Sequence, residues 1–228
     1  MEEKMQQHSA REEILQKLKT APKQSLSPRP DLPPLSELSM TQEEMIHRFT
    51  ERLVEETGVV YRVQNNQGAL EKLAEIARAE GLKKVMVSTD DVLATLDLPA
   101  WGKRNDVTVM TPHDFPNRDS FRDAVFNEAQ AGITGADFAV AESGTLGLIH
   151  NKDQARLVSL APILHIAIVP VERMNPIYER VVDQVFGNLK TLPSQFLFIT
   201  GPSMTGDIQG VLFKGMHGPR KVIVILVG

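Results

Sequence analysis

A glycine-rich stretch near the carboxyl terminus carries residues suited to holding a small anion. Gly201 follows an apolar run, and Ser203, Thr205 and Asp207 stand shortly after it. A helix that begins near Ser203 would present free backbone N–H groups and two hydroxyls, which together favour a carboxylate. Asp207 stands where a phosphate-binding loop needs lysine, so its charge disfavours phosphate. The alternative is a plain turn in which Ser203 only caps the helix.

The next glycine-rich turn contains an imidazole that its small neighbours leave free to reach a pocket. Gly215 precedes His217 and Gly218 follows it, and glycines allow the backbone to come close to a ligand. A histidine in this setting can donate a hydrogen bond to a substrate oxygen or shuttle a proton. The alternative is a loop histidine that follows a helix C-cap at Gly215.

A carboxylate and an arginine further upstream offer two more chemically useful groups. Glu142 ends a run of small apolar residues and is followed by Gly144 and Thr145. In partly dry surroundings its carboxylate would serve as a general base or an acyl acceptor. Arg156 could clamp a substrate carboxylate with two parallel hydrogen bonds. The alternatives are an exposed hairpin residue for Glu142 and a helix-surface side chain for Arg156.

Metal and redox centres are not expected in this chain. It contains no cysteine, which removes disulfides, thiolate nucleophiles, cysteine-bound zinc and iron–sulfur clusters. His113, His150 and His165 lie far apart in the sequence, without the spacing of a histidine metal site. No G-x-G-x-x-G sequence marks a dinucleotide site. We therefore expect any redox cofactor to belong to a partner.

Composition narrows the class of partner. The 228 residues include 25 Lys and Arg against 29 Asp and Glu, which leaves a net charge of −4 and no basic field for a polyanion. Nucleic acid and anionic membranes are therefore poor partners. No apolar run approaches the roughly 18 residues of a spanning helix, and the first residues lack a signal-peptide pattern. We expect a cytoplasmic protein without membrane insertion.

The first 40 residues are expected to form an arm outside the compact domain. Ser9 and Glu12 make a capping box before an apolar stripe, which predicts a helix over residues 9–19. Five prolines between residues 22 and 34 predict an extended linker after it. An arm of this kind either docks late in folding or grips a neighbouring subunit, which would build a homo-oligomer.

Residues 41–228 alternate short β-branched runs with helical patterns, which predicts an α/β domain. Its first helix would begin with a capping box of Thr41 and Glu44 and stop at Gly58. Several strands are apolar at successive positions, which is typical of an open sheet covered by helices on both faces, in three layers. Strands are expected at residues 59–63, 84–88, 107–110, 136–141, 145–149, 164–169, 196–200 and 221–227. Helices are expected at residues 68–80, 90–96, 118–131 and 176–186 and from about 203.

The predicted topology brings the candidate residues together. Loops that follow different strands meet at the carboxyl edge of an open sheet, where ligands usually bind. We therefore expect Glu142, Ser203 and His217 to converge on one cleft at that edge.

Three groups of residues, in a specific order and spacing, resemble the lactate utilization protein C family and its LUD domain. They span most of residues 45–228. The groups are Gly132 to Asp137 with Ala141 to Thr145, Ala155 to Pro162 with His165 and Ile166, and Gly201 to Ile208 with His217 to Pro219. One departure is Met204, which stands where arginine is usual and so weakens the expected anion site.

The resemblance implies a fold similar to that of ribose-phosphate isomerases and CoA-transferases. It also implies a role in oxidising L-lactate to pyruvate beside partner proteins that carry iron–sulfur clusters. We favour an accessory subunit that binds a small carboxylate. A free-standing isomerase or acyl-CoA transferase that uses Glu142 and a non-catalytic ligand sensor are the alternatives, so whether the chain is itself an enzyme stays open.

Overall fold

The computed structural model describes residues 2–21, 39–151, 153–187, 192–193, 195–206 and 212–228. The chain divides into two units, Met1–Leu35 and Ser36–Gly228. Helix α1 (Glu2–Thr20) belongs to the first unit. The expected start at Ser9 is wrong, because that residue lies inside α1. The large apolar side chains of α1 that are described, Ile14, Leu15 and Leu18, are exposed.

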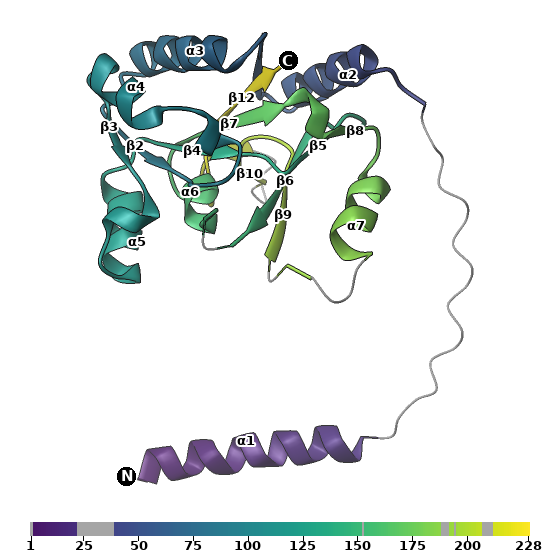
Figure 1. Cartoon of the computed structure of the whole chain (residues 1–228). Coiled ribbons are helices and arrows are strands. Elements are labelled where there is room, and N and C mark those ends of the chain that lie inside the picture. Colours follow the sequence, from purple (N-terminus) through teal and green to yellow (C-terminus); the bar gives the residue numbers. More distant parts are fainter. Residues whose placement is uncertain (1, 22–38, 152, 188–191, 194, 207–211) are drawn as a thin grey trace. The chain divides into compact units, whose positions relative to one another are not determined.

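The second unit is built on a six-stranded parallel sheet (Figure 1). Its four inner strands are largely apolar at successive positions and buried on both faces, as a parallel sheet between two covering layers requires. The expected α/β fold is therefore confirmed. In spatial order the strands are β1 (Val59–Val63), β12 (Lys221–Val227), β7 (Leu164–Pro170), β4 (Ala131–Gly135), β2 (Lys84–Val87) and β3 (Thr108–Met110).

Two helices cover one face of the parallel sheet. They are α3 (Asn66–Ala79) and α4 (Leu98–Asn105), joined to the sheet by a single apolar core. Trp101 is 1% exposed at the centre of this core, and its indole donates to the Leu70 carbonyl at 3.1 Å. Helix α4 was not expected, although Asp97 caps it by accepting from the Ala100 nitrogen at 3.0 Å and Pro99 occupies its first turn.

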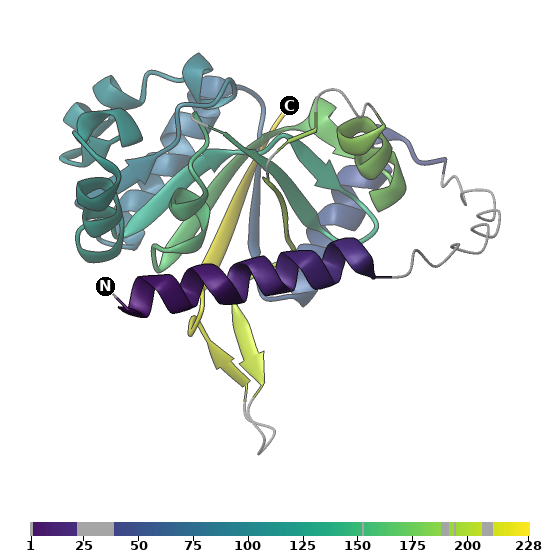
Figure 2. The same cartoon turned by 90° about the horizontal axis from the view of Figure 1, so that it is seen from below.

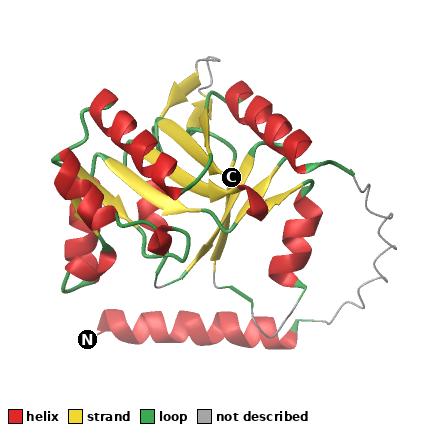
Figure 3. Ribbon diagram, turned by 45° about the horizontal axis from the view of Figure 1, so that its top comes forward, coloured by secondary structure: helices red, strands yellow, loops and turns green. Residues whose placement is uncertain are grey.

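The other face is covered by helices at one end and by a second sheet at the other (Figure 3). Helices α5 (Arg118–Asn127) and α6 (Arg156–Leu160) pack on β2 and β4, while α2 (Gln42–Glu55) packs on β7 and β12 together with the second sheet. Helix α7 (Tyr178–Phe186) packs on the second sheet. That sheet has the order β8 (Met174–Asn175), β5 (Phe138–Val140), β6 (Thr145–His150) and β9 (Gln195–Ile199).

Strand β4 was missed because its sequence looks unlike a strand. The helix expected to reach residue 131 ends at Asn127, and Ala131–Gly135 then forms a central, fully buried strand. A Cβ atom placed on Gly132 would lie 1.7 Å from the Val158 carbonyl oxygen. Glycine is needed here because α6 lies against the strand backbone, which is a tertiary requirement.

The start of α2 is confirmed and its stop is not. The Thr41 nitrogen donates to Glu44 at 2.7 Å, and the Glu44 nitrogen donates back to the Thr41 hydroxyl at 3.3 Å. The left-handed residue that ends the helix is Thr57, with φ of 65°, rather than Gly58. Gly58 instead donates its N–H to the Leu53 carbonyl at 2.8 Å. The predicted helix at residues 90–96 shrinks to a single 3₁₀ turn, Leu93–Thr95.

Candidate functional site

Glu142 lies at the beginning of helix α7. Its Oε1 accepts a hydrogen bond from the Tyr178 nitrogen at 2.8 Å, and its own nitrogen donates to the Pro176 carbonyl at 3.1 Å. A carboxylate at a helix amino terminus satisfies a free N–H group and interacts favourably with the helix dipole. Glu142 therefore has a structural task, and it lies in the turn of the β5–β6 hairpin that the sequence predicted.

The two residues that follow in this turn are also held tightly. Gly144 has φ of 65°, and a Cβ atom placed on it would lie 2.4 Å from the Leu53 nitrogen, so α2 leaves room only for glycine. The buried Thr145 hydroxyl lies 2.7 Å from the Tyr178 hydroxyl and 2.9 Å from that of Thr200. These hydroxyls bond one another and join the hairpin to α7 and β9.

The Gly201–Asp207 stretch does not start a helix. Met204–Gly206 forms strand β10, which pairs antiparallel with β11 (Leu212–Lys214) in a hairpin that projects from the main sheet (Figure 2). The Ser203 nitrogen donates to the Pro219 carbonyl at 2.8 Å, and its carbonyl accepts from Gly215 at 2.8 Å. These long-range bonds take the backbone groups that a helix would have used. Asp207 lies outside the described residues.

The helix dipole therefore plays no part in anion binding at this turn. Gly201 packs against the end of α2, where an added Cβ atom would lie 3.0 Å from the Glu56 carbonyl oxygen. Thr205 pairs with Phe213 in the hairpin, and the neighbouring Met204 is 40% exposed. Any positive charge for an anion must come from elsewhere.

A pocket of about 370 Å³ lies where the base of the hairpin meets α5 and α6. It brings together three of the predicted residues, Arg156, His217 and Gly218. Ser203 lies beside it, since a Cβ atom placed on Gly218 would be 3.1 Å from the Ser203 Cβ atom. The described lining consists of Phe126, Arg156, Leu157, Leu160, Ala161, Ile163, Gly215, Met216, His217, Gly218 and Arg220.

The charged groups of this pocket have one sign. Arg156 and Arg220 both line it, and no carboxylate is found among its described lining residues. Neither guanidinium forms an ion pair within the described part of the chain. Gly215 has φ of 80°, and an added Cβ atom would lie 1.9 Å from the Arg220 Cγ atom, so this glycine gives the Arg220 side chain its path. The arrangement suits an anion.

The pocket lies at the amino edge of the sheet, not at the expected carboxyl edge. Strands β7 and β12 begin beside it at Leu164 and Lys221, and the Arg220 nitrogen donates to the Ile163 carbonyl at 2.8 Å. The prediction of a shared cleft at the carboxyl edge is therefore wrong. Ser203 and His217 lie in the segment that leads into β12, so they precede that strand and are not at its carboxyl end.

The carboxyl edge between β2 and β4 is filled by a side chain. Asp90 accepts from the Ser88 hydroxyl at 2.5 Å, the Leu93 nitrogen at 3.0 Å and the Gly135 nitrogen at 2.9 Å. A Cβ atom placed on Gly135 would lie 2.3 Å from Asp90 Oδ1. The crevice that a ligand would enter in an open α/β sheet therefore already contains a carboxylate with three donors.

Two buried histidines lie between the layers near α6. The His165 Nε2 atom lies 2.9 Å from the Thr134 hydroxyl, and burial lowers the pKa of His165 to about 4. Burial also lowers the pKa of His150, and the positive charge of Arg156 adds to this effect. His165 Nδ1 and His150 Nε2 have no hydrogen-bond partner among the described residues. Both imidazoles are thus neutral at pH 7.

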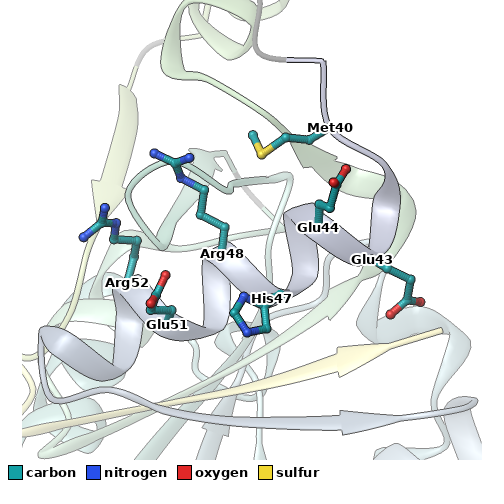
Figure 4. A pocket seen from close by; sticks show the side chains of 7 residues that line it. All are labelled: Met40, Glu43, Glu44, His47, Arg48, Glu51 and Arg52. Carbon is teal, nitrogen blue, oxygen red and sulfur yellow. The ribbon is translucent and has the colours of Figure 1, made fainter.

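A second hollow, of about 690 Å³, runs along α2 and has mixed charge (Figure 4). Glu43 pairs with Arg62 at 2.6 Å, and Arg52 pairs with Glu55 at 2.8 Å. Arg48 Nε has no hydrogen-bond partner among the described residues, but three glutamates line the same hollow. Its described lining is Met40, Glu43, Glu44, His47, Arg48, Glu51 and Arg52. The hollow is less suited to an anion than the pocket that contains Arg156 and Arg220.

The described residues include no group of three or more histidine, aspartate or glutamate side chains arranged to hold a metal ion. Among the same residues, no helix has the length and apolar character needed to cross a membrane.

Comparisons with known proteins identify the family. The LUD domain model matches residues 46–227. A protein named lactate utilization protein C from Anoxybacillus flavithermus is 32% identical over 166 residues, which cover 72% of this chain and 73% of that protein. The Bacillus subtilis protein of the same name is 43% identical over 103 residues, covering 44% of this chain and 43% of that protein, less than half its length.

A solved structure supports the fold. The crystal structure of a DUF162 family protein from Deinococcus radiodurans has a TM-score of 0.59 and 24% sequence identity, and the match covers 83% of this chain and all of that one. At this level of identity the likeness concerns the α/β fold alone. The family model, which covers most of the second unit including the hairpin base and the pocket, carries the assignment: the chain belongs to the LUD domain family.

Proposed function

We propose that this protein takes part in lactate utilization as a subunit that binds a small carboxylate, such as L-lactate or pyruvate. The relatives named lactate utilization protein C support the process. The observation that supports the ligand is a pocket lined by Arg156 and Arg220, with no carboxylate among its described lining. Neither guanidinium forms an ion pair with the residues that the structure describes. An arginine can bind both oxygens of a carboxylate at once.

The proposal gives each pocket residue a task. Arg156 holds the carboxylate, and His217 donates to the neighbouring oxygen of the ligand. Gly218 and Ser203 shape the turn that faces it. Removal of hydrogen from lactate needs an electron acceptor, which a chain without cysteine leaves to iron–sulfur partner proteins.

Geometry favours this binding role over acyl transfer by Glu142. An acyl acceptor must be free to attack a bound thioester, whereas Glu142 caps α7 through its bond to Tyr178. A free-standing enzyme of the CoA-transferase kind is therefore the weaker proposal.

Calorimetric titration with L-lactate tests the ligand. Loss of a charged hydrogen-bond pair costs about 1.5–3 kcal/mol, so Arg156→Gln should weaken lactate binding at least ten-fold. Arg104→Gln is the matched control, because Arg104 is an exposed arginine of α4 on the opposite face of the sheet. Equal affinities of the two variants, or no lactate binding by the wild type, would refute the assignment.

The partner proposal has its own test. The tagged protein, expressed beside the iron–sulfur proteins of a lactate oxidation system, should retain them on purification with their cluster absorbance. Lactate-dependent reduction of the clusters should require this chain. Full lactate oxidation by the partners alone would contradict the proposal.

A further inference from the structure

We propose that the pocket at the hairpin base accepts 2-hydroxy or 2-oxo carboxylates whose side chain is longer than the methyl group of lactate. The inference rests on the proposed function, because it assumes a carboxylate in the pocket of Arg156 and Arg220. It concerns which acid of this class fits best, and it follows from the donors, the walls and the volume of the pocket.

The donors match a carboxylate with one more oxygen beside it. One guanidinium is sufficient to bind a carboxylate in a bidentate way. Arg220 and His217 also line the pocket, and their side chains carry further N–H donors that a bound ligand can satisfy. A hydroxyl or oxo oxygen on the adjacent carbon supplies an acceptor, which a simple fatty acid lacks.

The rest of the wall is apolar and in large part exposed. Ile163 and Met216 are each 63% exposed, and Phe126 is 59% exposed, while Leu157, Leu160 and Ala161 complete the apolar lining. Exposed apolar side chains that gather around one pocket mark a binding surface. A second carboxylate on the ligand would have to lie against these groups, so a monocarboxylate with an apolar side chain fits better.

The volume agrees with a ligand larger than lactate. About 370 Å³ falls within the range of about 300–1,000 Å³ that small-molecule sites occupy. A lactate methyl group would reach little of the surface of Phe126, Ile163 and Met216. A branched side chain, such as the isobutyl group of 4-methyl-2-hydroxypentanoate, would cover more of it.

Calorimetry with matched acids on the full chain tests the inference. Each buried methylene tightens binding about four-fold, so partial burial of the isobutyl group should make 4-methyl-2-hydroxypentanoate about ten-fold tighter than lactate. Its analogue without the hydroxyl, 4-methylpentanoate, should bind at least ten-fold more weakly than the hydroxy acid. Malate, with its second carboxylate, should bind less tightly than the branched acid.

Substitutions of two apolar residues that line the pocket test where the side chain of the bound acid lies. Ile163→Thr and Met216→Gln should each reduce the preference for the branched acid over lactate about three-fold. Both residues are exposed, so neither variant removes core packing. Val54→Thr is the matched control, because Val54 is 53% exposed on α2 and does not line the pocket.

The outcomes separate this inference from the proposed function. If lactate binds and the branched acid binds no tighter, or if malate binds tighter than both, the inference is overturned while the lactate proposal stands. A preference that neither wall variant alters places the side chain elsewhere and also overturns it. If no acid of the panel binds, the proposed function fails and the inference fails with it.

Discussion

Replacing Asp90 by alanine should destabilise the α/β unit more than any replacement of an exposed carboxylate. The Asp90 carboxylate accepts three hydrogen bonds in the crevice between β2 and β4, and two of its donors are the backbone N–H groups of Leu93 and Gly135. Both of these residues are buried. In Asp90→Ala their N–H groups lose the acceptor while the surrounding chain stays in place.

The magnitude follows from the two orphaned donors. A buried donor without a partner costs about 1–3 kcal/mol, so two cost about 2–6 kcal/mol. Water entering the space left by the carboxylate offsets part of this, and we expect a loss of about 3 kcal/mol. For a chain of this size that loss lowers the melting temperature by roughly 6–12 °C.

Urea unfolding, followed by circular dichroism, measures the effect. Asp90→Ala should lower the unfolding midpoint without changing the slope, because the surface exposed on unfolding is the same. Asp91→Ala is the control: this neighbouring carboxylate is 71% exposed and pairs with Arg173, an arrangement worth about 0–1 kcal/mol. If the two variants unfold within about 0.5 kcal/mol of each other, the view that Asp90 fills and seals the crevice is wrong.

Three further predictions follow from the interior. Burial lowers the pKa of His165 to about 4 from 6.5, so the unfolded chain binds the extra proton and the fold loses stability as pH falls from about 6.5 towards 4, by up to about 3 kcal/mol. His165→Gln should flatten that part of the pH–stability curve, and a curve as steep as that of the wild type would contradict this. Gly132→Ala should lower the melting temperature and the near-UV circular dichroism signal, because its Cβ atom would lie 1.7 Å from the Val158 carbonyl oxygen; an unchanged melting temperature would mean that α6 is not held there. Thr145→Val should cost about 1–2 kcal/mol in urea unfolding, since the hydroxyls around Thr145 lose their common partner. No loss would show that they are satisfied otherwise.

The sequence singled out three residues that share a pocket, but it did not predict where that pocket lies in the fold. Arg156, His217 and Gly218 do line one pocket. Arg220, which adds the second guanidinium, was missed because an arginine before a strand looks like a surface residue. The sequence feature that could have indicated it is Gly215. This glycine has φ of 80°, and its lack of a side chain makes room for that of Arg220. Glu142 was placed correctly in a hairpin turn, yet only the fold shows that it caps α7.

Sequence by itself determined the elements whose cause is local. The capping box of Thr41 and Glu44 set the start of α2, and the unbroken apolar run of residues 222–227 after Lys221 predicted strand β12 to the residue. Both depend on side chains within a few positions of one another, so periodicity and capping rules are sufficient to find them.

Only the tertiary structure decided the elements whose cause is distant. From the sequence, Gly132 suggests a break in regular structure, but it lies in a central strand. Glycine is needed at this position because the Val158 carbonyl leaves no room for a side chain. From the sequence, Ser203 suggests a helix cap, but its backbone forms hydrogen bonds with Gly215 and Pro219. These bonds favour a hairpin for the residues that follow. The same long-range pairing placed the pocket of Arg156 and Arg220 at the amino edge of the sheet, because hydrogen bonds between distant segments outweigh the small free energies of local preference.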